Sequence, residues 1–105
     1  MNSSIVIALP KIDDAKKIRT ILNRHGFSVA AVCSTASTAL ASMSELDGGI
    51  LICGYKLTDR YYQDVLEDIP SYFEMLLLAS GRVIAEAPTS VLTVEMPMKV
   101  SDLVN

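Results

Sequence analysis

Short apolar runs alternate with amphipathic stretches along this chain, with a period of roughly twenty residues. The central run, 49–54, is entered from the turn Asp47-Gly48 and has glycine at both ends. Runs of this kind, rich in β-branched residues, are typical of strands that helices cover on both faces of a parallel sheet. The five predicted strands are 4–9, 27–32, 49–54, 73–78 and 91–94.

The stretch after the first predicted strand has the spacing of an amphipathic helix. Asp13 is its predicted N-cap, and Gly26, just beyond Arg24 and His25, is its predicted stop. The apolar face consists of Ala15, Ile18, Ile21 and Leu22.

Two further helices are predicted between the later strands. Ser34 or Thr35 would cap the second helix, and Thr58 or Asp59 would cap the third, which Pro70 would end. Their apolar stripes are Ala36, Ala39, Leu40 and Met43 in the second and Tyr61, Tyr62, Val65, Leu66 and Ile69 in the third.

The last connection is shorter than a usual parallel crossover, so we expect a shortened fourth helix over 82–86. A fifth helix begins over 101–105 and is truncated there, which leads us to expect an output domain after residue 105. The alternation of strands and helices predicts one α/β domain over 1–105. Its expected fold is the flavodoxin-like, doubly wound five-stranded parallel sheet, with strand order 2-1-3-4-5.

Composition narrows the class of protein. The chain has 105 residues, half of them hydrophobic, which suffices for one core. The net charge of −3, without a basic stripe, argues against direct binding of DNA or RNA. No signal peptide or membrane span is predicted, and Cys33 and Cys53 are expected to be buried, reduced thiols of a cytoplasmic protein.

The carboxyl ends of parallel strands are where such folds place their chemistry. Four of the five predicted strands would bring their ends together there. The residues at these ends are Ala8, Leu9 and Pro10 after the first strand, Gly54 after the third, Ala79 and Ser80 after the fourth, and Glu95, Met96 and Pro97 after the fifth.

This layout resembles the receiver domain of bacterial response regulators over nearly the whole chain. The resemblance implies a magnesium ion held by an acidic pair, a phosphoryl-accepting aspartate, a hydroxyl residue and a lysine before a proline. Here the acidic pair falls on Ala8 and Leu9, the acceptor on Gly54 and the lysine on Met96. Pro97 matches the proline that follows the lysine in the receiver pattern. Ser80 is a possible remnant of the hydroxyl residue in that pattern. Magnesium and phosphoryl transfer need oxygen ligands that these residues lack, so no metal or cofactor is expected.

Displaced acidic residues offer an alternative. Asp13 and Asp14 could be a displaced acidic pair, and Asp59 a displaced phosphoryl acceptor, although all three suit helix amino ends. His25 is interpreted as a solvated residue in the last turn of a helix.

Tyrosines and methionines gather near the expected site and the last two strands. Tyr55, Tyr61, Tyr62 and Tyr72 could stack on a ligand, but a role at the edge of the core is favoured. Met75, Met96 and Met98 could fill the core or form an adaptable contact face. The resemblance implies a homodimer or a protein partner at the face of strands four and five.

Among receivers, the sequence is most similar to the amino-terminal domain of ANTAR-type antiterminator regulators. The likeness lies in 5–11, 51–55 and 72–77. It implies an RNA-binding output domain after residue 105, so that RNA would be contacted only by that domain.

These observations lead to three hypotheses. The first is a non-catalytic pseudo-receiver that controls an output domain by protein contact. The second is a phosphorylatable receiver of a two-component phosphorelay that uses a displaced aspartate. The third is a small-ligand-binding flavodoxin-like domain, which the absence of a Gly-rich phosphate loop disfavours.

Overall fold

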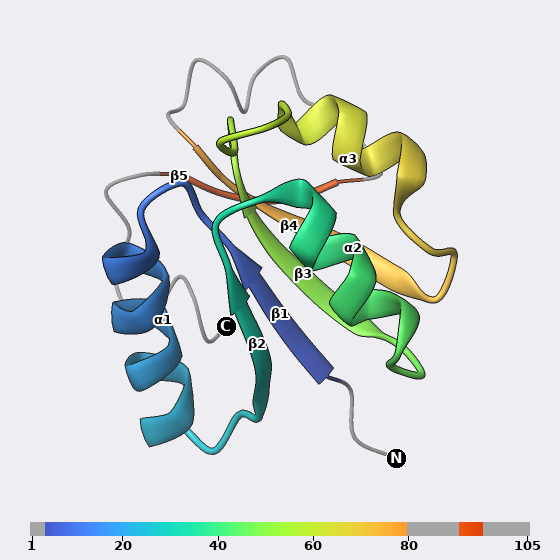
Figure 1. Ribbon diagram of the computed structural model, residues 1–105. Coiled ribbons are helices and arrows are strands. Elements are labelled where there is room, and N and C mark those ends of the chain that lie inside the picture. The colour runs from blue at the N-terminus through green and yellow to red at the C-terminus, as the bar shows by residue number, and fades with distance from the viewer. Residues whose placement is uncertain (1–3, 80–90, 96–105) are drawn as a thin grey trace.

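The computed structural model describes residues 4–79 and 91–95, which form a parallel five-stranded sheet of order β2-β1-β3-β4-β5 (Figure 1). The predicted fold class and strand order are therefore confirmed. The strands are β1 Ser4–Ala8, β2 Val29–Cys33, β3 Gly49–Gly54, β4 Phe73–Ala79 and β5 Leu92–Glu95. The predicted fourth and fifth helices, Ser80, Met96, Met98 and Pro97 lie outside the described residues.

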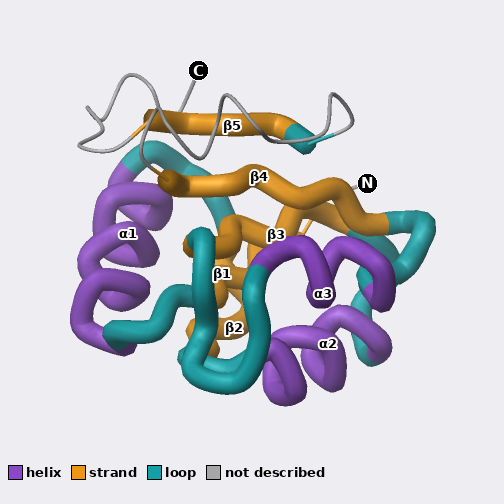
Figure 2. The backbone as a smooth tube through the Cα atoms, turned by 90° about the horizontal axis from the view of Figure 1, so that it is seen from above, coloured by secondary structure: helices purple, strands orange, loops and turns teal. Residues whose placement is uncertain are grey.

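Helices cover both faces of the sheet, as Figures 1 and 2 show from two directions. Helix α1, Ile12–Arg24, packs on one face, and α2, Ala36–Ser44, and α3, Tyr62–Asp68, pack on the other. Successive side chains of β1 point to opposite faces of the sheet. Val6 therefore packs in the core under α2 and α3, and Ile7 packs in the core under α1. Both side chains are fully buried, as expected for a central parallel strand.

Helix α1 begins two residues earlier than its predicted cap would place it. The N-cap is Lys11, which makes no side-chain cap, so the prediction of Asp13 as the N-cap is wrong. Asp13 and Asp14 occupy the first turn instead, where their charges favour the positive end of the helix dipole.

The predicted stop of α1 at Gly26 is confirmed, and it also explains where β2 begins. Gly26 has φ +85°, and its N–H donates to the Asn23 carbonyl at 3.2 Å. The N–H of Phe27 donates to the Leu22 carbonyl at 3.0 Å, completing a Schellman-type end. Phe27 is therefore part of the hydrogen-bonded end of α1. β2 accordingly starts at Val29 rather than at residue 27.

Helix α2 is capped as predicted, whereas α3 is not. The Thr35 hydroxyl accepts a hydrogen bond from the Thr38 N–H at 3.2 Å. The N-cap of α3 is Tyr61, without a side-chain cap, so the prediction of Thr58 or Asp59 at that position is wrong. The reason is an antiparallel bridge between Lys56 and Tyr61, which folds 55–61 into a small hairpin before α3 begins.

The turn into the central strand requires glycine. A Cβ atom on Gly49 would clash with the Ser4 carbonyl oxygen, and the φ of Gly49 is +155°. Its N–H donates to the Tyr72 carbonyl at 3.1 Å. Because the backbones of Gly49 and Ser4 lie this close together, the start of β3 fits between β1 and β4.

Within residues 4–79 and 91–95, no helix has the length and apolar character needed to cross a membrane.

Candidate functional site at the strand ends

The register of the sheet brings the predicted site positions together. Ala8 at the end of β1 pairs with Cys53, and the next residue of β3 is Gly54, which pairs with Leu78. Ala79 ends β4 beside β5. The ends of β1, β3, β4 and β5 thus form one edge, as the sequence predicts for a parallel sheet.

The side chains that the ends of β1, β3 and β4 place at this edge are apolar within the described residues. Ala8 is fully buried, and Leu9 and Ala79 are buried. A Cβ atom placed on Gly54 would lie 3.1 Å from Cδ2 of Leu9 and 3.5 Å from Cδ of Pro10. Among the described residues, the atoms nearest to this Cβ position are therefore hydrocarbon.

The magnesium ion implied by the receiver resemblance does not fit these residues. Mg²⁺ takes hard oxygen ligands, usually including one or two carboxylates. Ala8, Leu9 and Gly54 supply no side-chain oxygen. Across the described ranges there is also no group of three or more His, Cys, Asp or Glu residues that could hold a metal ion.

Asp59, the candidate displaced acceptor, lies at the amino end of α2. Its Oδ1 accepts a hydrogen bond from the Ala36 N–H at 2.7 Å, and its Oδ2 accepts from the Ser37 N–H at 3.2 Å and the Ser37 hydroxyl at 3.1 Å. The Ala36 hydrogen bond, with smaller contributions from Ser37, lowers the pKa of Asp59 from its ordinary value. This carboxylate caps a neighbouring helix, a role that the sequence did not reveal because the two residues are 23 positions apart.

The other polar candidates lie in α1. Asp13 and Asp14 are exposed in its first turn. His25 is the exposed C-cap of the same helix, in agreement with its interpretation as a solvated residue. The hydrogen bonds of the described residues connect none of the three to the ends of the strands.

The predicted burial of the cysteines is confirmed, and both thiols are free. Ala8 pairs with Cys33 on one side and with Cys53 on the other, so one strand separates the cysteines. Two strand spacings place their Cα atoms about 10 Å apart, whereas a disulfide requires less than about 7 Å. Burial raises the pKa of Cys53 to about 12, which suits a packing residue rather than a nucleophile.

The tyrosines divide between two roles. Tyr62 is buried in the core under α3, as favoured from the sequence. Tyr55 and Tyr61 are exposed and meet edge to face with 5.3 Å between ring centroids, while Nζ of Lys56 lies 5.3 Å from the Tyr61 ring. This exposed pair follows from the hairpin at 55–61, which helical spacing alone could not indicate.

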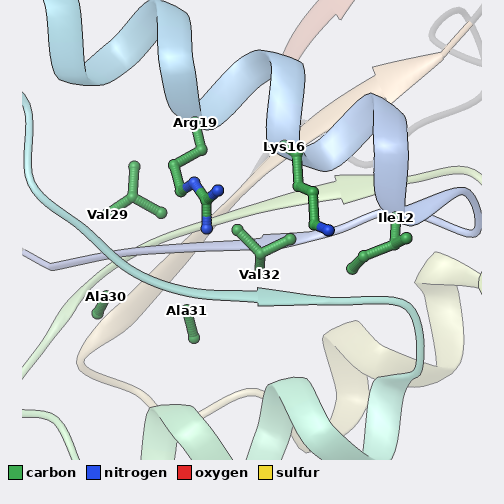
Figure 3. A pocket seen from close by; sticks show the side chains of 7 residues that line it. All are labelled: Ile12, Lys16, Arg19, Val29, Ala30, Ala31 and Val32. Carbon is green, nitrogen blue, oxygen red and sulfur yellow. The ribbon is translucent and has the colours of Figure 1, made fainter.

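A second surface feature lies away from the strand ends. A groove of about 280 Å³ runs between α1 and β2 (Figure 3). The sequence analysis did not identify it, because its cationic and apolar walls come from separate elements.

No family model matches the sequence, and no curated protein matches it. Similarity is found among solved structures. The CheY-like response regulator receiver domain of Methylobacillus flagellatus has a TM-score of 0.80 and 13% identity, over 98% of this chain and 93% of that chain. A response regulator receiver domain protein of Clostridium thermocellum has a TM-score of 0.82 and 17% identity, over 96% and 87% of the respective chains.

The response regulator PhyR of Brucella abortus is also similar, with a TM-score of 0.80, 18% identity and 99% of this chain covered. This chain spans 46% of that protein, so less than half of its length. Together, the strand order, the position of the helices and these neighbours show that the chain has the fold of response regulator receiver domains.

Proposed function

We propose that this chain is a non-catalytic pseudo-receiver, a signalling module that works by protein contact rather than by phosphoryl transfer. The observation that carries the proposal is the apolar contact expected at the end of β3, where Leu9 stands against Gly54. Phosphoryl transfer requires a nucleophilic oxygen and neutralisation of charge, and neither Gly54 nor its neighbours Ala8 and Leu9 offers them.

The proposed contact surface is the face of strands β4 and β5, through which the chain would form a homodimer or bind a partner protein. Leu92 in the edge strand β5 supports this choice, since 49% of its surface is exposed. Met75 is buried in the core and fills space there, so it does not contribute to this face.

The proposed output is a carboxy-terminal, RNA-binding antiterminator domain that this module would control in the cytoplasm. Its support is the sequence likeness to ANTAR-type regulators over 5–11, 51–55 and 72–77. The net charge of −3 fits a module that leaves RNA contact to another domain.

The test is isothermal titration of the purified chain with Mg²⁺ and beryllofluoride, a phosphoryl mimic, with sedimentation velocity on the same sample. We expect no saturable heat and no change in mass. A receiver domain that retains its aspartate and acidic pair serves as the positive control. Saturable binding by this chain would overturn the proposal.

Variants identify the residue responsible if binding is seen. Loss of binding in Asp59→Asn would identify Asp59 as a displaced phosphoryl acceptor. Loss of binding in Asp13→Asn or Asp14→Asn would identify these residues as a displaced acidic pair. The hydrogen bonds from 36–37 to Asp59 count against the first outcome, because they already engage both of its carboxylate oxygens.

A further inference from the structure

The groove between α1 and β2 combines an apolar floor with a cationic wall. Its floor is the stretch 29–32 of β2, and Ile12, Lys16 and Arg19 line it from α1. Figure 3 shows the side chains of Lys16 and Arg19 extending from the helix toward the strand. The spacing of these three residues places them on one face of α1.

The floor of the groove is an edge strand. Among the described strands β2 pairs with β1 alone, so no strand of residues 4–79 or 91–95 lies on its other side. The Cys33 carbonyl accepts a hydrogen bond from the Leu9 N–H of the loop after β1 at 3.1 Å. The N–H and C=O of one strand residue point to the same side, and those of the next residue point to the other side, so the N–H and C=O of Val32 point away from β1. An edge of this kind can pair with another extended chain.

Within residues 4–79 and 91–95, the charges above the groove have no ion-pair partner. Among the described residues the ion pair is Arg60 with Asp68, at 2.7 Å, which lies in the region of α3. Lys16 and Arg19 are exposed and take part in no ion pair within the described ranges. A ligand that adds a strand to β2 would meet both cations along its length.

We propose that this groove binds an extended acidic segment of a partner protein, which adds to β2 as a sixth strand. The backbone of the segment would pair with the outward peptide groups of β2, and its carboxylates would face Lys16 and Arg19. The apolar side chains of 29–32 would contact alternate residues of the segment.

A second copy of this chain suits the groove less well. Two-fold pairing of β2 with itself would set the two α1 helices side by side on one face of the joined sheet. Lys16 and Arg19 of each copy would then meet the same cations of the other, and like charges disfavour such an interface. β2 also contains no acidic residue that could neutralise them.

The test uses two blocked strand peptides that differ only in charge. One alternates valine with glutamate and the other alternates valine with lysine, each flanked by threonine. Heteronuclear NMR of the full chain follows their titration to millimolar concentration. We expect the glutamate peptide to cause saturable shifts of the amides at 12–19 and 29–33, weakened by salt, and the lysine peptide to cause none.

Hydrogen exchange tests the strand geometry without a substitution. The outward N–H of Val32 is expected to exchange more slowly when the glutamate peptide is bound. Unchanged exchange at saturation would overturn strand addition.

A matched pair of variants tests the charges. The double variant Lys16→Glu with Arg19→Glu should lower the affinity for the glutamate peptide by about tenfold or more, since both cations face the peptide. Lys17→Glu with Arg24→Glu makes the same change of net charge at exposed α1 positions outside the groove and should leave affinity within about twofold.

Besides unchanged hydrogen exchange at Val32, three results would overturn the proposal. They are absence of saturable shifts at 29–33, equal binding of the lysine peptide, and equal loss of affinity in the two double variants. Concentration-dependent dimerisation that maps to 29–33 in sedimentation and NMR would assign the groove to a second copy instead.

Discussion

Leu9 stands where a side chain on Gly54 would project, with its Cδ2 atom 3.1 Å from the position of a Cβ atom on that glycine. The two residues lie at the ends of neighbouring strands β1 and β3. Leu9 is buried, and Gly54 is buried too. An acidic side chain at position 54 would therefore enter a hydrocarbon environment.

We expect Gly54→Asp to destabilise the protein by about 2 kcal/mol or more at pH 7, because burial disfavours a carboxylate without a partner. Burial raises the pKa of this new carboxyl above its value in the unfolded chain. The charge penalty is then absent below the unfolded pKa of about 3.9 and grows as the pH rises. Urea unfolding at several pH values measures it.

Gly54→Asn is the matched control, because it adds a side chain of the same size and shape without the charge. The difference in the free energy of unfolding between the Asp and Asn variants should shrink as the pH falls toward about 4. A difference that is constant between pH 4 and 7 would show that the carboxylate is not buried.

Gly54→Asp alone is also expected to remain unlabelled by acetyl phosphate. The new carboxylate would face Leu9 and Pro10, and Ala8 and Leu9 would still provide no magnesium ligand. Phosphate incorporation is read by Phos-tag electrophoresis and intact mass. Robust labelling of this variant would contradict the inference that the residues around position 54 cannot hold magnesium.

Asp59→Ala should destabilise the protein by about 1 kcal/mol, the usual effect of losing a helix cap. The carboxylate is exposed, so solvent screening keeps the effect at this size. Glu67→Ala, at an exposed position of α3, is the control and should change stability by less than about 0.5 kcal/mol.

The effect of Asp59 should depend on pH in the direction set by its lowered pKa. A carboxyl whose pKa is lower in the folded state contributes stability above its unfolded pKa, ordinarily 3.8, and loses it as the pH falls through the folded value. The gap between wild type and Asp59→Ala should therefore narrow in acid. A gap that widens there would refute the capping role.

Cys53 should make the protein less stable at alkaline pH. Its thiol has an ordinary pKa of 9.0, and burial raises the pKa to about 12. The unfolded chain thus ionises first, and stability present below pH 9 declines between pH 9 and 12. Denaturant unfolding of wild type and Cys53→Ala measures the slope, which should be shallower in the variant.

Gly26→Ala should lower the free energy of unfolding by about 1 kcal/mol, because alanine disfavours the backbone conformation of this position. The φ of +85° is strained for alanine, and a Cβ atom here would meet no heavy atom of the described residues within 4 Å. Gly26→Asn should cost less, because asparagine tolerates this region better. Equal stability of wild type and the alanine variant would show that the helix stop relaxes without strain.

The arrangement of elements was predictable because short-range patterns report on it directly. The apolar run at 49–54 coincides with β3, and Thr35 and Gly26 mark the ends of helices through contacts within a few residues. Parallel connection then leaves few sheet orders open, and the predicted one is observed.

The roles of Asp59 and of the hairpin at 55–61 were not predictable in this way. Asp59 reads locally as a cap for α3, but its carboxylate binds the amino end of α2 instead. Which helix Asp59 caps depends on how the chain between residues 36 and 59 folds. Residue spacing along the sequence does not show that the start of α2 lies near Asp59 in space.

The amino-acid sequence by itself determined the order of strands and helices, the apolar residues at the strand ends and the burial of both cysteines, because hydrophobic periodicity and turn residues act over short distances. Only the tertiary structure decided that Leu9 faces Gly54, that Asp59 caps α2, and that Lys16 and Arg19 line a groove beside β2. Each of these depends on packing between elements that are distant in the chain.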